Sequence, residues 1–348
     1  MSEIKTQQSL YPWLVKPYLS LAKDLSDNRL HHALLFHSSV SLGKAQLLER
    51  LVKLIHCTQI NEHKACGQCQ DCQLHASNTH SDFYHIACLD NKSQISIEQI
   101  RTLSQKVIGT GLVNKRRVVV IDGVESMTES AQNALLKILE EPPLHVYFLL
   151  STSKLAQVSA TILSRCFKMA INQPERAKLL KWLERKSGKS ITSDQLSLLG
   201  DSPLKAIEAL DSDQFLLIEP MLSRSNALYL AWQNRQLEQA CSEAINLAQE
   251  IEKLTSHKSN PVALDECLMM IIRFNHWAAK GQLLTGTTNT VLAPALQTGM
   301  NKIDTVCLTD FDRKMNQLRH QLADNTGLNG LMQLRNVLIE ITERIIGH

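Results

Sequence analysis

The segment HSSVSLGKA at residues 37–45 follows most of the phosphate-binding loop pattern G-x-x-x-x-G-K-[ST]. In a complete loop the glycines let backbone N–H groups surround the phosphates, the lysine reaches the outer phosphates, and the hydroxyl group holds magnesium. Gly43 and Lys44 stand at their expected positions, but Ser38 replaces the first glycine and Ala45 replaces the hydroxyl residue. We therefore expect a loop that places a side chain where phosphate should approach and that lacks its magnesium ligand.

A carboxylate that could serve the same loop follows an apolar run. Residues 118–121 predict a buried strand, and Asp122 at its end occupies the position of the usual second magnesium contact. The next residue is Gly123, where an ATPase would place a glutamate to orient the attacking water. Phosphoryl transfer depends on positioning and charge stabilisation, so these combined losses should abolish turnover. The sequence predicts that this chain does not hydrolyse ATP by itself and leaves residual nucleotide binding open.

Four cysteines follow the spacing C-x8-C-x2-C-x2-C and could hold a metal ion: Cys57, Cys66, Cys69 and Cys72. Four thiolates within one short segment suit a tetrahedral zinc ion whose four coordination positions are all filled by the protein, so the zinc would be structural. An iron–sulfur cluster and a metal-free cluster are the alternatives, although the C-P that follows iron–sulfur ligands is missing. The nearby His63, His75 and His80 are interpreted as ordinary surface residues.

The remaining cysteines are scattered, and we interpret them as small buried apolar side chains: Cys88, Cys166, Cys241, Cys267 and Cys307. A zinc deaminase is excluded because the H-x-E and P-C-x-x-C signature is absent.

An arginine ends a short helical pattern at residues 159–165, just before an extended run at 166–171. An arginine at such a domain edge is ordinarily a solvated charge. Arg165 acquires a functional interpretation only from the motifs that surround it.

The composition is that of an ordinary globular protein, with 44% hydrophobic and 20% charged residues. A length of 348 residues favours two or three domains. The 37 basic and 34 acidic residues give a formal charge of +3, which argues against a protein whose main task is coating nucleic acid. Neither a signal peptide nor a long apolar run is present, so we expect a cytoplasmic protein without a membrane segment.

Short apolar runs alternate with helical patterns up to about residue 172, which predicts a parallel sheet covered by helices on both faces. Gln99 three residues after Ser96 predicts a capping box at the start of one of these helices. Short helical segments follow to about residue 210, and long ones such as 263–284 and 331–346 complete the chain. The expected fold is an α/β domain, a small helical domain and a larger all-α domain.

Several motifs together resemble those of the delta-prime family of bacterial DNA polymerase III clamp-loader subunits. They are YPWL, HHALLF, the altered loop, the four-cysteine excursion, NALLKILEEPP and LSRC, at residues 11–14, 31–36, 37–45, 57–72, 133–143 and 163–166. A late T-G-[hydrophobic]-N element is echoed at residues 326–329. The ATP-hydrolysing gamma/tau subunits share the cysteines and the EEPP and SRC elements, and the altered loop decides against them.

This resemblance implies a RecA-like AAA+ domain at residues 1–172 with a zinc-binding insertion at 57–72. It also implies a small helical lid domain at 173–213 and a helical collar domain for oligomerisation at 214–348. The chain would then belong to a hetero-pentamer with gamma/tau and delta subunits that loads a sliding clamp onto primed DNA. That complex is part of the DNA polymerase III holoenzyme, a nucleotidyltransferase assembly.

The resemblance also assigns roles to particular residues. Arg165 of the SRC element would be an arginine finger that reaches the ATP site of a neighbouring subunit, where such a group can raise the rate by about three to five orders of magnitude. Thr152 lies near the position that senses the terminal phosphate. Leu204 occupies the slot of a sensing arginine, and Lys205 beside it is interpreted as a charge on a solvated helix face.

Two alternatives remain at this stage. The first is an active gamma/tau-like ATPase subunit with an unorthodox loop. The second is a zinc-knuckle nucleic-acid-binding protein, which would need basic and aromatic residues around the cysteines, whereas residues 57–72 contain Lys64 and no aromatic residue. Trp232 and Trp277 in the helical half could pack internally or against partner helices, and the sequence does not distinguish the two.

Overall fold

The computed structural model describes residues 9–38, 41–89, 92, 94–108, 116–191, 193–212, 214–256, 262–283, 305–324 and 329–347. Residues 326–328 of the late T-G-[hydrophobic]-N element and the side chain of Trp277 lie outside the described residues. The chain divides into two compact units, residues 1–175 and 176–348. The division into domains at 1–172, 173–213 and 214–348 stays a prediction.

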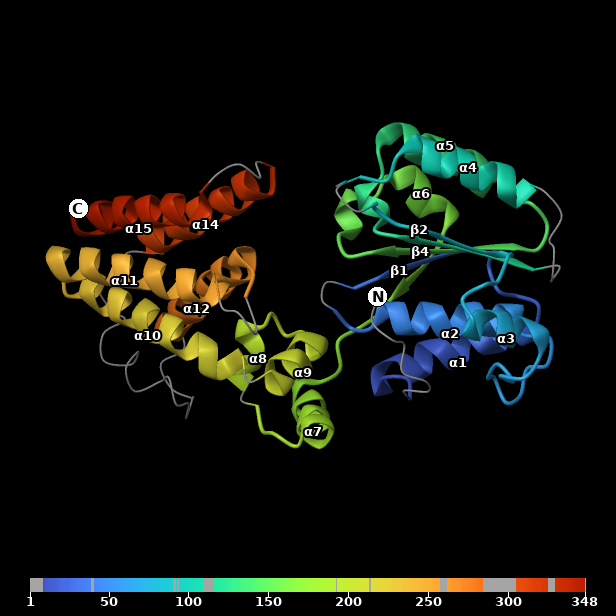
Figure 1. Cartoon of the computed structure of the whole chain (residues 1–348), viewed down its shortest axis with the longest axis horizontal. Helices are drawn as coiled ribbons and strands as arrows, with labels where there is room; N and C mark the ends of the chain where they lie inside the picture. Colours follow the sequence, from blue (N-terminus) through green and yellow to red (C-terminus); the bar gives the residue numbers. More distant parts are fainter. Residues whose placement is uncertain are drawn as a thin grey trace. The chain divides into compact units, whose positions relative to one another are not determined.

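The first unit is an α/β structure that is coloured from blue to green in Figure 1. Its elements are α1 (Pro12–Ser26), β1 (Ala33–His37), α2 (Lys44–His56), α3 (Gln70–Ala76), β2 (Phe83–Ile86), α4 (Ile97–Ile108), β3 (Arg117–Asp122), η1 (Val124–Ser126), α5 (Glu129–Glu140), β4 (Val146–Thr152), η2 (Leu155–Gln157), α6 (Ala160–Arg165) and β5 (Phe167–Ala170).

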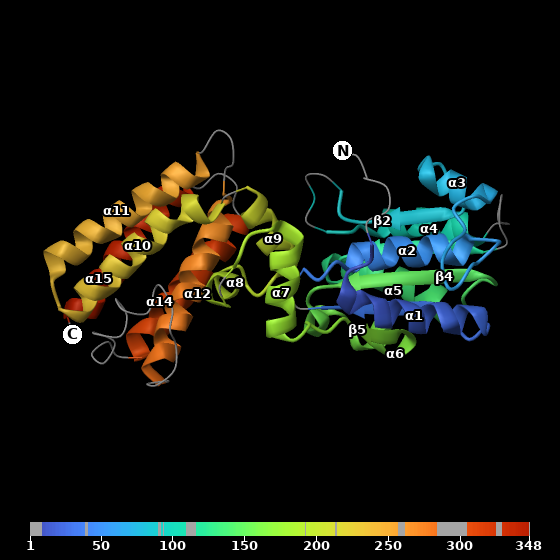
Figure 2. The same ribbon diagram turned by 90° about the horizontal axis from the view of Figure 1, so that it is seen from below.

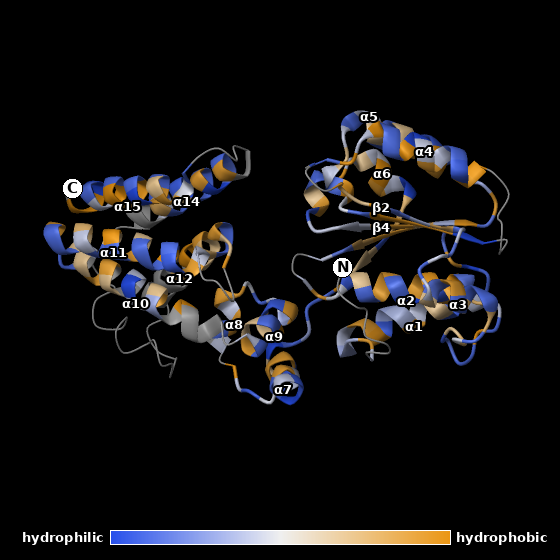
Figure 3. Cartoon of the chain, viewed as in Figure 1, coloured by the Kyte–Doolittle hydropathy of each residue, from blue (hydrophilic) through white to orange (hydrophobic). Residues whose placement is uncertain are grey.

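The five strands form one sheet in the order β2-β3-β4-β1-β5, and every neighbouring pair is parallel. Its inner strands β1, β3 and β4 are largely buried on both faces because helices cover both, and Figure 3 shows the middle of the sheet in hydrophobic colours. Leu35 points into a core shared with α4, α5 and α6, whereas Leu34 and Phe36 point into a second core with α1 and α2. The expected parallel α/β domain is therefore confirmed.

Local signals fix the ends of the covering helices. Thr128 caps α5, since its hydroxyl oxygen accepts a hydrogen bond from the Ala131 amide at 3.2 Å. The same helix ends at Glu140, just before a pair of prolines that cannot continue it. At α4, the Gln99 side chain accepts a hydrogen bond from the Ser96 amide at 3.0 Å, which is one half of the expected capping box.

The regular secondary structure of the second unit is all helical within its described residues. Its helices are α7 (Arg176–Ser187), α8 (Ser193–Leu198), α9 (Pro203–Asp211), α10 (Gln214–Gln233), α11 (Leu237–Thr255), α12 (Leu264–Leu283), α14 (Thr305–Asp324) and α15 (Gly330–Gly347). Figure 2 shows α10, α11 and α15 side by side, and α10 and α15 both contact α11. Among the described residues, no helix combines the length and apolar character needed to cross a bilayer.

Trp232 packs inside the second unit. Its side chain is buried, its Nε1 donates a hydrogen bond to the Thr342 hydroxyl at 3.0 Å, and its ring meets Phe311 edge to face. These contacts join α10 to α15 and α14. The structure thus settles for Trp232 the question that the sequence left open.

The turn between α8 and α9 depends on two glycine-specific features. Gly200 has φ of +72°, and a Cβ atom there would lie 2.5 Å from Nη2 of Arg273. The Arg273 side chain from α12 donates a hydrogen bond to the Leu198 carbonyl at 2.8 Å, so it is held in place beside the glycine. Beyond this turn, Lys205 forms an ion pair with Glu266 of α12 at 2.7 Å, and its side chain is 41% exposed, so it is a solvated charge that also has a partner.

Gly200→Ala is expected to lower the free energy of unfolding by about 2–3 kcal/mol, because strain in the left-handed backbone adds to the displacement of Arg273. Gly188→Ala is the matched control, since Gly188 has φ of +70° and open space around the missing Cβ. That variant should lose only about 1 kcal/mol. Chemical denaturation of both variants measures the difference, and equal losses would contradict the role given to Arg273.

Candidate functional site

The altered phosphate loop connects β1 to α2, as the pattern requires. Gly43 caps α2 with φ of 82°, and a Cβ atom there would lie 2.5 Å from the Tyr11 ring. Ser38, which replaces the first glycine of the pattern, is a buried residue. Trp13 stacks on Tyr11, and its Nε1 donates a hydrogen bond to the Leu42 carbonyl at 2.8 Å. The segment that precedes α1 is thus packed directly against the loop.

The loop lysine is bound by groups of its own chain. Lys44 Nζ donates hydrogen bonds to the Thr152 carbonyl at 2.6 Å and to the Ser153 hydroxyl at 3.3 Å, both at the end of β4. Burial lowers the pKa of Lys44, and the nearby carboxylates of Glu125 and Asp122 oppose that shift. The charge that would face phosphates in an active loop is therefore partly satisfied within the protein.

Asp122 lies at the same edge of the sheet, as the sequence predicts. Its carboxylate accepts a hydrogen bond from the Ser151 hydroxyl, so it is tied to β4. Glu125 was not identified from the sequence, and its Oε1 accepts a hydrogen bond from the Ser153 amide at 3.0 Å. Ala45 stands where the phosphate-loop pattern has a hydroxyl residue, and Gly123 stands where an ATPase is expected to place a glutamate.

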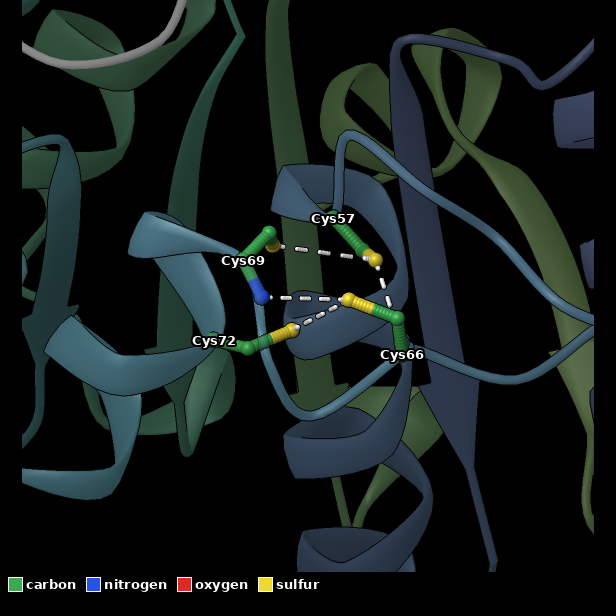
Figure 4. Close-up of side chains that lie close together, drawn as sticks. All are labelled: Cys57, Cys66, Cys69 and Cys72. Carbon is green, nitrogen blue, oxygen red and sulfur yellow. Dashed lines mark hydrogen bonds between the residues drawn. The ribbon is translucent and has the colours of Figure 1, made fainter.

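The four-cysteine cluster has the geometry of a single-ion site, and Figure 4 shows its side chains converging. Cys57 caps the end of α2, Cys69 caps the start of α3, and Cys72 lies in α3. The sulfurs all lie within 4.8 Å of one another, with Cys66 to Cys72 and Cys57 to Cys69 both 4.0 Å apart. Tetrahedral zinc with bonds of about 2.3 Å needs sulfurs about 3.8 Å apart, so the donor set fits one such ion.

Backbone N–H groups support thiolates in this cluster. The amides of Gln68 and Cys69 donate to the Cys66 sulfur at 3.4 and 3.2 Å, and they lower the pKa of that thiol. At Cys57 and Cys72 burial raises the pKa, which a bound cation would counteract. A cluster of several iron ions would need the sulfurs further apart than they are, so the arrangement favours a single ion over the iron–sulfur alternative.

Three histidines lie beside the cysteine cluster, and this corrects the interpretation of His75 and His80 as surface residues. His56 and His80 are buried, and the rings of His56, His75 and His80 stack with centroids 4.0 to 4.9 Å apart. Nδ1 of His56 lies 2.7 Å from Nε2 of His75, a hydrogen-bond distance. His80 contacts the Asp71 carboxylate through Nε2 at 3.2 Å and accepts the Asp82 amide at Nδ1.

Ring nitrogens of the three histidines lie within 4.8 Å of one another, but the orientation of the rings does not suit a metal ion. A metal ion lies in the plane of each imidazole that binds it, whereas these rings are within 19 to 28° of parallel and face one another. Burial is the main reason that the pKa of His56 is lowered to about 3, and the neighbouring His80 and His75 lower it further. Burial also lowers the pKa of His75 to about 4. The three rings join the end of α2 to α3 and to the segment before β2.

Arg165 ends α6 and lies directly before β5. Its Nη1 donates hydrogen bonds to the Thr161 carbonyl at 2.9 Å and to the Ser164 hydroxyl at 3.4 Å, and its Nη2 forms an ion pair with Glu140. About a third of the side chain is exposed, at 32%. Arg165 is therefore a surface group that is held by polar contacts.

The altered loop and Arg165 lie at opposite edges of the sheet. All strands are parallel, so the loop after β1 and Asp122 at the end of β3 share the carboxyl edge. Arg165 precedes Phe167, which pairs with Leu34 near the start of β1, and therefore lies at the amino edge. A strand as long as β1 spans about 13 Å, which is too far for this arginine to reach its own loop.

The strand order, the loop after β1 and the carboxylate at the end of β3 define the class of protein. The first unit is a RecA-like AAA+ domain, and helices follow it.

The comparisons with known proteins identify the family. The family model described as "DNA polymerase III, delta subunit" matches residues 16–175. The DNA polymerase III subunit delta' of Yersinia pestis is 31% identical over 332 residues, which are 94% of this chain and 94% of that protein. The chain therefore belongs to the DNA polymerase III subunit delta' family.

Two other similarities are less extensive. A DNA polymerase III subunit tau/gamma of Haemophilus influenzae is 34% identical over 164 residues, 47% of this chain and 23% of that protein. A solved structure of a gamma subunit-related protein from Thermotoga maritima aligns with a TM-score of 0.47 at 19% identity, covering 94% of this chain and 99% of that one. Because the delta' relative matches nearly the whole chain, the gamma/tau alternative is not favoured.

Proposed function

We propose that this chain is a clamp-loader subunit that does not hydrolyse ATP by itself and supplies Arg165 to the ATP site of a neighbouring subunit. The observation that carries this proposal is the position of Arg165 at the amino edge of the sheet, away from its own altered loop. A guanidinium group there can act only on a nucleotide bound by another chain. Its planar fork suits the bidentate binding of phosphate oxygens.

The proposed lack of hydrolysis rests on the loop itself. Ser38 and Ala45 replace the glycine and the hydroxyl of the pattern, Gly123 replaces the glutamate, and Lys44 bonds to the end of β4. Residual nucleotide binding is left open, because Lys44 and Asp122 remain at the carboxyl edge. The isolated chain should show no turnover above a Lys44→Ala control, and measurable hydrolysis that depends on Lys44 would contradict the proposal.

We further propose that the partners are gamma/tau and delta subunits in a hetero-pentamer, and through it the sliding clamp and primed DNA, in the cytoplasm. The similarity to a delta' relative along nearly the whole chain supports this assembly. An independent zinc-knuckle function gains no support from the described cluster, because no aromatic residue lies between Cys57 and Cys72. The sulfurs and histidines there instead tie α2, α3 and β2 together.

The metal proposed for Cys57, Cys66, Cys69 and Cys72 is structural zinc. It would fix the excursion between α2 and β2, and all four donor positions would come from the protein. Protein purified without chelators should contain about one zinc ion per chain, and Cys72→Ser should lose it and lower the Tm. Cys241→Ser is the control that should retain the metal, and less than about half an equivalent in the wild type would contradict the proposal.

The finger is tested in a reconstituted loader that contains Arg165→Ala. Turnover at one neighbouring site should fall by about three orders of magnitude or more, because the transition-state charge loses its donor. Arg165→Lys should restore little, since a lysine cannot form the planar bidentate contact. Arg185→Ala, which removes an exposed arginine of α7, is the control for charge, and a sizing column checks assembly. Unchanged turnover in an assembled Arg165→Ala complex would overturn the proposal.

A further inference from the structure

Arg165 is held against its own subunit by a carboxylate from another helix. Glu140 is the last residue of α5, Arg165 is the last residue of α6, and these two helices contact each other. The Glu140 carboxylate pairs with Nη2 of Arg165, while the Thr161 carbonyl and the Ser164 hydroxyl accept hydrogen bonds from Nη1. The guanidinium is thus fixed from both sides, and the side chains of Glu140 and Arg165 remain 48% and 32% exposed.

Helix physics does not explain a carboxylate at position 140. The carboxyl end of a helix carries partial negative charge, so an acidic side chain there is unfavourable unless a cation compensates it. Lys137 is the basic residue in the last turn of α5, and Arg165 from α6 adds a positive charge in direct contact with Glu140. The contact with Arg165 therefore compensates the unfavourable position of the Glu140 charge at the end of α5.

The pair is also weak enough to exchange. Exposed ion pairs of this kind shift an equilibrium by no more than about fivefold. A phosphate group carries more charge than a carboxylate and can bind the guanidinium through two parallel hydrogen bonds. The terminal phosphate of a nucleotide on a neighbouring subunit would therefore compete with Glu140 for Arg165.

We propose that Glu140 is a positioning residue that holds Arg165 on its own subunit until the phosphates of a neighbour's nucleotide replace the carboxylate. This inference rests on the proposed trans-acting role of Arg165 and adds a competitor for that arginine within the same chain. The competition makes engagement of the arginine conditional on nucleotide in the neighbouring site. It also makes the engagement sensitive to ionic strength, because salt screens an exposed pair.

The test is Glu140→Gln in the reconstituted loader, with ATP turnover measured without DNA at low and at high ionic strength. Glutamine keeps the shape of the side chain and removes the competing charge, so kcat/KM should rise by about two- to fivefold at low salt. The ratio of variant to wild type should approach one at high salt, and using this ratio cancels effects of salt that both complexes share. A fall in kcat/KM, or no change at either salt concentration, would overturn the proposal.

Two further variants test whether the effect of Glu140→Gln is specific to that residue and depends on Arg165. Glu141→Gln removes the same charge one residue away. The Glu141 side chain forms no hydrogen bond or ion pair with any residue that the structure describes, so this variant should leave turnover unchanged. An equal rise in kcat/KM for Glu141→Gln would mean that removing any nearby negative charge has this effect, and it would overturn the proposal. Glu140→Gln should also have no effect in an Arg165→Ala background, because its action requires the arginine.

The results for Arg165→Ala show whether the proposed finger is wrong or only the proposed role of Glu140. If Arg165→Ala leaves turnover intact, the proposed trans-acting finger is wrong, and the role given to Glu140 is wrong with it. If Arg165→Ala abolishes turnover at one site and Glu140→Gln changes nothing, the finger stands and only the role of Glu140 is rejected.

Discussion

The parallel sheet is the constraint on which the other features depend. In a parallel sheet the two edges at which the strands begin and end carry different residues, because every strand begins at the amino edge and ends at the carboxyl edge. Here the carboxyl edge carries the altered loop, Asp122 and Ser151, and the amino edge carries Arg165. A single chain with this topology cannot bring both sets of groups to one nucleotide. Any use of Arg165 on a phosphate therefore requires a second subunit.

The carboxyl edge retains the architecture of a nucleotide site while its polar groups contact one another. Lys44 bonds to the end of β4, Asp122 binds Ser151, and Glu125 accepts the Ser153 amide. The Tyr11 ring occupies the space beside Gly43. These contacts hold Gly43 beside the Tyr11 ring and Lys44 against the end of β4. The domain can thus preserve the shape that presents α6 and Arg165 at the other edge.

Local patterns in the sequence were sufficient for the strands, the cysteine cluster and the ends of the helices. Val119 and Leu149 lie in runs that are apolar on both faces, and Cys66, Cys69 and Cys72 are close in sequence, so spacing alone places them together. The contacts that were missed join residues with no periodic relation, such as His56 with His80 and Lys205 with Glu266. Polar residues of this kind look like surface residues until tertiary packing brings their partners. The contact between Glu140 and Arg165 belongs to the same class.

The most direct measurement of the central claim is the affinity of the assembled loader for ADP with aluminium fluoride, which mimics the transferring phosphoryl group. A finger that acts in the transition state should matter for this complex and not for ADP alone. Arg165→Ala should weaken binding of the mimic at one site by about a thousandfold and leave ADP binding unchanged. Arg185→Ala, which removes an exposed arginine of α7, should leave both affinities as they are. Equal affinity for the mimic in the wild type and in Arg165→Ala would contradict the account.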